Sequence, residues 1–137
     1  MSFPLRTRRL LLAACLMLLI APFRLAGAQD AVTAEAHKQW MNDASDAQED
    51  YRFAVTDKNQ KAAVEALAKL EALMGKTEEY WAAKKSADGV RLASEAKTLA
   101  AQAGAAAKAG KMSDASAVFD RMGATCNTCH ELHLEKK

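Results

Sequence analysis

Proline is nearly absent from this chain of 137 residues, whose only two prolines, Pro4 and Pro22, lie near its start. β-Branched residues are also few after residue 28, and no Asn-Gly pair marks a hairpin turn. The residues that are abundant there, Ala, Glu, Lys, Gln and Leu, are strong helix formers. These absences argue against a β-sheet protein, and the composition predicts an all-helical domain.

A hydrophobic run long enough to span a membrane is missing too. The apolar stretch Leu10–Ala21 contains 12 residues and stops at Pro22, whereas a transmembrane helix needs about 20. Three arginines precede the stretch, and a small-x-small cleavage pattern follows at residues 26–28. We therefore interpret residues 1–28 as a secretory signal peptide that is cut after Ala28, rather than as a transmembrane helix.

A lipoprotein leader is the alternative interpretation. Leu12–Cys15 fits the pattern that is cut before a lipidated cysteine, but the apolar run continues past Cys15, where a lipidated cysteine would end it. We expect the mature domain, residues 29–137, to be periplasmic, with no stable membrane insertion once the signal peptide is removed.

An excess of positive charge is also lacking once the leader is set aside. The whole chain has 19 Lys and Arg against 17 Asp and Glu, and its net charge is +2. Four of the arginines and none of the acids lie in residues 1–28, which leaves 15 basic against 17 acidic side chains and a net charge of −2. No basic stripe remains, so we expect no nucleic-acid partner.

Apolar residues recur at three- and four-residue steps through four segments of the mature chain, as is typical of amphipathic helices. The segments cover about residues 32–56, 61 to the low 80s, 86–109 and 113 onward. Within the second segment, Gly75 could mark a bend, since glycine is a poor helix former.

Short connections between four helices predict an antiparallel up-down-up-down four-helix bundle. Ser86 and the pair Ser113-Asp114 are the expected N-caps of the third and fourth helices, and Gly110 is the expected stop of the third. In such a bundle the start of the first helix lies beside the end of the fourth.

The end of the fourth segment carries a motif with a definite chemistry. Residues 126–130 read Cys-Asn-Thr-Cys-His, which is the C-x-x-C-H signature of covalent haem attachment. Cys126 and Cys129 would form thioether bonds to the two vinyl groups of one haem c. His130 would then be the proximal ligand of the iron. An export signal agrees with this motif, because covalent haem attachment takes place outside the bacterial cytoplasm.

Other uses of these residues remain open at this point. Cys126 and Cys129 could form a disulfide in an oxidising compartment. A thioredoxin-like redox pair needs a βαβ context, which is missing. Together with His130 and His133, the two cysteines nearly supply the four ligands of a zinc site.

With this motif near its C-terminus, the alanine-rich chain resembles the class II cytochromes c, the cytochrome c prime group. Class I cytochromes c carry the motif near the N-terminus instead. The resemblance covers residues 29–137 and rests specifically on residues 126–130 and their position. It implies a haem protein with periplasmic redox partner proteins, and homodimerisation through the first two helices. The chain departs from the family where members often have a basic residue after the motif, since Leu134 is apolar.

The sixth position of the iron divides this family. High-spin members leave it open and bind small gases, whereas low-spin members fill it with a methionine from the first helix. Antiparallel geometry places the residue opposite His130 near positions 36 to 42. We predict Met41 as the distal ligand, because a thioether opposite histidine is a common low-spin pair that raises the reduction potential. His37, one turn earlier, and an open site are the competing possibilities.

The sequence therefore predicts a periplasmic monohaem c-type cytochrome that carries single electrons with His130 and Met41 as axial ligands. No catalytic acid, base or nucleophile constellation is present, so we do not expect an enzyme. The alternatives are a high-spin, five-coordinate cytochrome c prime that binds NO or CO, and a structural bundle with an accidental motif.

Other residues have weaker assignments. Gly123 could make room for the haem plane, and His133 receives no role. The residues that could line the haem pocket are Trp40, Phe119 and Met122, and those that could pair with the haem propionates are Lys38 and Arg52.

Overall fold

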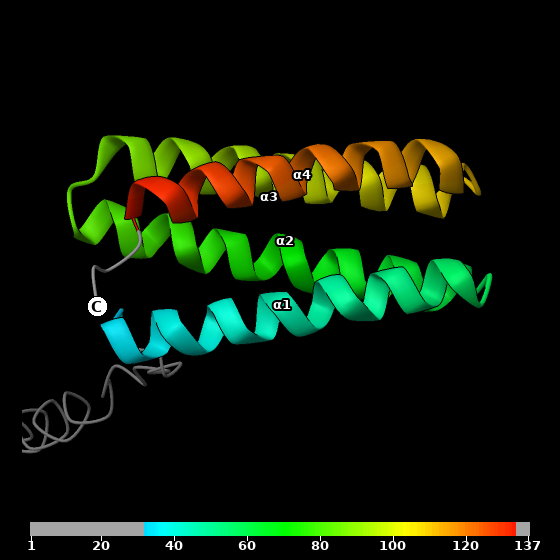
Figure 1. Cartoon of the computed structure of the whole chain (residues 1–137), viewed down its shortest axis with the longest axis horizontal. Helices are drawn as coiled ribbons and strands as arrows, with labels where there is room; N and C mark the ends of the chain where they lie inside the picture. Colours follow the sequence, from blue (N-terminus) through cyan, green and yellow to red (C-terminus); the bar gives the residue numbers. More distant parts are fainter. Residues whose placement is uncertain (1–31, 134–137) are drawn as a thin grey trace, which may run out of the picture.

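Four α-helices make up the computed structural model, which describes residues 32–133. They are α1 (Ala34–Thr56), α2 (Gln60–Ala83), α3 (Ala87–Lys108) and α4 (Met112–His133), and no strand occurs between residues 32 and 133. All four run along the long axis of the molecule (Figure 1). The all-helical class and the four helical segments are thus confirmed, while the predicted signal peptide and Leu134 lie outside the described residues.

Three of the helices begin at a polar N-cap residue. The side chains of Thr33, Asn59 and Ser86 accept hydrogen bonds from the amides three residues further on, at 3.1, 3.1 and 3.3 Å. Each bond satisfies an amide that the helix itself leaves without a partner. The predicted cap at Ser86 is therefore confirmed. The stop at Gly110 is confirmed as well, since α3 ends at Lys108 and Gly110 follows with a φ of +75°, a left-handed conformation that glycine adopts without steric cost.

The α2 helix runs through Gly75 without a break, and the bend there stays a prediction. One detail of the predicted helices is wrong. The α4 helix begins at Met112, so Ser113-Asp114 lies in its first turn and is not its cap. The reason is a tight connection, since the Lys111 carbonyl already accepts the helical hydrogen bond from the Ala115 amide at 2.9 Å.

Small side chains dominate the contacts between the helices. Ala47, Ala63, Ala100 and Ala103 are completely buried, and so is Leu67 between them. Because alanine projects little from the helix surface, neighbouring backbones approach closely. Close packing of this kind joins α1 to α2, α2 to α3 and α3 to α4, and the α1–α4 pair is less closely packed.

The helices α1 and α4 meet mainly through side chains at one end of the molecule. There the Tyr51 hydroxyl lies 3.2 Å from the Ser116 hydroxyl, and the Tyr51 and Phe119 rings are 4.3 Å apart. The opposite end of the molecule holds the start of α1, the end of α4 and the α2–α3 connection (Figure 1). None of the described helices is both long and apolar enough to cross a membrane.

Candidate functional site

The end of the molecule that holds the end of α4 contains a cavity of about 670 Å³. This volume lies within the range of about 300–1,000 Å³ that is typical of small-molecule and cofactor sites. Residues of all four helices line it. The apolar part of the lining comes from all four helices and includes Met41, Leu70, Met74, Leu92, Ala96 and Met122.

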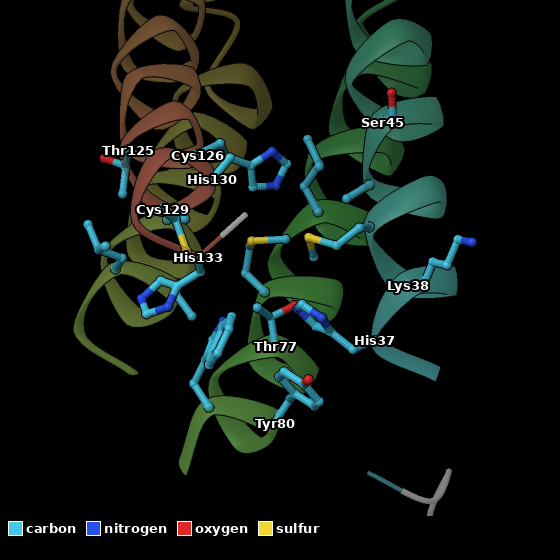
Figure 2. Close-up of a pocket in the computed structure, with 18 of the residues that line it drawn as sticks. His37, Lys38, Ser45, Thr77, Tyr80, Thr125, Cys126, Cys129, His130 and His133 are labelled. Carbon is cyan, nitrogen blue, oxygen red and sulfur yellow. The ribbon is translucent and has the colours of Figure 1, made fainter. Parts of the chain in front are cut away.

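The three residues of the C-x-x-C-H motif all line this cavity. Cys126 and Cys129 are half-buried on α4, and the His130 side chain is exposed. Figure 2 shows the His130 ring projecting from α4 toward α1. Residues three or four positions apart share a helix face, which is why a single α-helix can place Cys126, Cys129 and His130 on one cavity.

Both cysteines are free thiols in the structure. Burial, and secondarily the neighbouring Cys129, raises the pKa of the Cys126 thiol to about 11. The pKa of Cys129 is raised by burial and then by the negative charge of Asp88. Both groups are therefore protonated at neutral pH, and the thiolate that disulfide exchange requires is scarce.

Met41 lines the same cavity from α1 and is half-buried. The structure therefore brings together four residues that the sequence proposed as a haem site, although they lie 85 or more positions apart between α1 and α4. Met41 thus shares the cavity with the motif, while its role as a ligand stays a prediction.

His37 also lines the cavity, but its ring is engaged by aromatic neighbours. It stacks on Tyr80 with a centroid separation of 4.0 Å and an interplanar angle of 1°, and Trp81 packs against it edge-on at 5.5 Å. Figure 2 shows His37 and Tyr80 together on one side of the cavity. An imidazole held in such a stack is less free to turn toward a ligand than an unstacked one.

A further contact at the cavity was missed from the sequence. The His133 ring packs on the Trp81 ring at 4.3 Å, and its Nε2 atom lies 3.4 Å from Asp88 Oδ2. Three helices thus meet at His133, to which the sequence assigned no role. The signal in the sequence was that Trp81 and His133 both lie near the ends of their helices, where an aromatic residue and a histidine can pack on each other.

Only some of the residues with weaker assignments lie at the cavity. Lys38 and Met122 line it. Arg52 and Phe119 instead lie against each other where Tyr51 meets Ser116, with the Arg52 Cζ atom 5.3 Å from the ring centroid. Trp40 is buried in the core with Lys76 over its ring. The assignments of Trp40 and Phe119 to the pocket, and of Arg52 to the propionates, are therefore not supported.

The indole Nε1 of Trp81 is buried and makes no hydrogen bond within residues 32–133. Leaving such a donor without an acceptor costs about 1–3 kcal/mol. Since Trp81 lines the cavity, an acceptor on a bound group, such as a haem carboxylate, would satisfy this donor. The apolar lining, the two thiols, the imidazole and this donor all suit a haem.

A protein-only metal site has less support. Within residues 32–133, no group of three or more His, Cys, Asp and Glu side chains is arranged to hold a metal ion. Cys126, Cys129, His130 and His133 therefore do not form a preassembled zinc site, in part because the His133 ring turns toward Trp81 and Asp88.

Comparisons of the chain with protein-family models, with curated proteins and with solved structures find no match.

Proposed function

We propose that this chain is a periplasmic monohaem c-type cytochrome that carries single electrons. In this proposal the four helices form an antiparallel up-down-up-down bundle of the class II cytochrome c kind. Cys126 and Cys129 attach one haem c covalently, and His130 and Met41 are the axial ligands of its iron. The packing of each helix on the next along the chain supports this arrangement of the bundle.

One observation carries the proposal. A single cavity of about 670 Å³ is lined by both cysteines and the histidine of the motif and also by Met41 from the other end of the described chain. An accidental C-x-x-C-H sequence would have no reason to face a cavity of this size. Met41 supplies a thioether on α1 at the same cavity, and a His/Met ligand pair is typical of low-spin cytochromes c.

Each residue has a distinct part in the proposed site. Cys126 and Cys129 would hold the haem through thioether bonds to its two vinyl groups. When bound, the haem iron supplies the one-electron change. His130 and Met41 fix the ligand set, and the apolar lining excludes water, which together tune the reduction potential.

The stacking of His37 supports Met41 as the distal ligand. To reach an iron in the cavity, the imidazole of His37 would have to leave its parallel contact with Tyr80, at a centroid distance of 4.0 Å. Met41 is unbranched and flexible, and its side chain can adapt to the position of the iron.

The experiment that tests the proposal is expression of the full chain in a host that matures c-type cytochromes. We expect haem to stay with the protein on a denaturing gel, and Cys126→Ala/Cys129→Ala to abolish this staining. The optical spectrum should be low-spin, with the methionine–iron charge-transfer band in the oxidised form and no ready CO binding in the reduced form.

Two results would change the conclusion. A chain without covalent haem would refute the cytochrome. A high-spin spectrum with rapid CO binding would retain the haem and replace the electron carrier by a five-coordinate gas-binding protein. The mass of the exported chain tests the leader separately, because we expect it to begin at Gln29.

A further inference from the structure

His133 is the last residue of α4, and its side chain is turned into the molecule. The side chain is only 16% exposed, its ring packs on Trp81 at 4.3 Å, and its Nε2 atom lies 3.4 Å from Asp88 Oδ2. Trp81 belongs to α2 and Asp88 to α3. The final turn of α4 is therefore tied to two other helices through one side chain.

Trp81 is a rigid surface for this contact. A Cβ atom built on Gly89 would lie 2.6 Å from two atoms of the Trp81 ring, so the indole packs directly against the α3 backbone. The Tyr80 ring also contacts it, edge-on at 5.0 Å. These contacts limit how far the partly buried indole can shift.

Asp88 is held by local hydrogen bonds. Its carboxylate accepts hydrogen bonds from the Ser86 hydroxyl at 2.7 Å and from the Gly89 amide at 3.0 Å. The Ser86 hydrogen bond is the main cause that lowers the pKa of Asp88, partial desolvation opposes it, and the Gly89 amide and His133 also lower it. The carboxylate is thus ionised at neutral pH and is held toward the end of α4.

The position of His133 in the sequence gives these contacts a consequence. The terminal turn of a helix frays easily, because its last carbonyls have no helical partners. Here that turn carries His130, and His133 follows His130 by three positions and Cys129 by four. Without an anchor, the turn that carries the proposed iron ligand would be the least stable part of α4.

We propose that His133 is a positioning residue, which through Trp81 and Asp88 holds the last turn of α4, and with it His130, in place at the cavity. This inference rests on the proposed function, in which His130 binds the iron. It assigns to His133 no contact with the haem.

The test compares His133→Ala with the matched control Glu131→Ala in the full-length, haem-containing protein. Glu131 lies on the same turn and its side chain is exposed. Hydrogen exchange of the amides of residues 127–133 measures the stability of the turn. The paramagnetically shifted proton resonances of the His130 ring measure its position on the iron, a readout that a general loss of stability would not alter.

We expect exchange in this segment to be about tenfold faster in His133→Ala than in Glu131→Ala, and the His130 resonances to split or broaden only in His133→Ala. His133→Phe keeps the ring contact with Trp81 and should restore a single set of resonances. If His133→Ala does not accumulate, Trp81→Leu, which removes the ring under His133, should give a change of the same kind.

The inference is overturned if His133→Ala and Glu131→Ala give the same resonances, whether or not exchange differs, because His133 would then act at most on local stability. A shift of the resonances without faster exchange would also overturn it, since the proposed route is the anchored turn. If the wild-type chain carries no haem, the proposed function itself has failed, and the exchange comparison still tests the anchor.

Discussion

At the scale of single residues, three methionines line one cavity, Met41, Met74 and Met122, and the first two come from neighbouring helices. Met41 is half-buried on α1, and Met74 is buried on α2. We predict that Met41→Ala converts the low-spin spectrum to a high-spin one, whereas Met74→Leu, a nearly volume-conserving change, leaves it low-spin. The reduction potential of Met41→Ala should fall by on the order of 100 mV, because axial ligands set haem potentials over about 0.8 V.

Optical spectra and potentiometric titrations of the two variants check this prediction. Loss of the low-spin spectrum in Met74→Leu alone would make Met74 the ligand. If neither variant changes the spectrum, neither methionine is the ligand, and His37 and Met122 become the candidates.

A second residue-scale prediction concerns Tyr51, whose hydroxyl lies 3.2 Å from that of Ser116 in a partly buried position. Removing this hydrogen bond with Tyr51→Phe should lower the free energy of unfolding by about 1 kcal/mol. Urea unfolding of Tyr51→Phe, Ser116→Ala and the double variant gives the coupling between the two residues. Fully additive effects would mean that the two hydroxyls do not interact.

At the scale of the helices, two glycines of α3 should respond to alanine in opposite ways. A Cβ at Gly89 would meet the Trp81 ring at 2.6 Å, whereas one at Gly104 would meet Leu67 Cβ at 3.8 Å, an ordinary contact. Gly89→Ala should therefore destabilise the protein by about 1–3 kcal/mol through overpacking. Gly104→Ala should be neutral or stabilise by up to about 1 kcal/mol, because alanine is the better helix former.

Thermal or urea unfolding of both variants checks this pair. An equal response at the two sites would show that Trp81 does not pack against the α3 backbone as described, and would remove the support for the His133 contact as well.

The first turn of α3 should also give the protein a defined pH dependence. The pKa of Asp88 is lowered from its ordinary value of 3.8, chiefly by the Ser86 hydrogen bond. The folded state therefore binds fewer protons than the unfolded state, and the stabilisation from Asp88 is present above pH about 4 and is lost as the pH falls through the lowered pKa.

We predict that wild type is more stable than Asp88→Asn at pH 7 and that the difference shrinks on acidification toward pH about 3. Urea unfolding at a series of pH values measures it. A difference that grows toward low pH would contradict the direction of the pKa shift.

At the scale of the whole molecule, a bound haem would complete the core of a small bundle. A group that binds only the folded state stabilises it, and here it would fill a cavity of about 670 Å³. We predict that the haem-containing protein is more stable than Cys126→Ala/Cys129→Ala by about 2–4 kcal/mol, which raises the Tm by about 10 °C or more in a domain of this size.

Calorimetry of the two proteins at equal concentration measures this difference. Equal melting temperatures would indicate that the haem does not occupy the cavity, even if it is attached. Sedimentation of the same samples would test the homodimer, which remains a prediction from the family resemblance.

Local chemistry was sufficient to predict the helices from the amino-acid sequence. The starts of α1, α2 and α3 follow from side chains that accept amide hydrogen bonds three residues further on, and the stop at Gly110 follows from the backbone freedom of glycine. Residues 126–130 could likewise be identified as a candidate site because the motif is contiguous. The start of α4 was missed because a backbone connection, not a side-chain cap, determines it.

The predicted order of the helices was enough to select Met41 as a candidate, but only the tertiary structure decided which other distant residues meet at the cavity. Periodicity marks Trp40, Met41, Phe119 and Met122 alike as inward-facing, yet Trp40 and Phe119 pack into the core elsewhere. The meeting of Trp81, Asp88 and His133 depends on how three helices are rotated about their axes and how far each extends. Those quantities are set by the summed packing of the alanine-rich core, which no short segment of the chain encodes by itself.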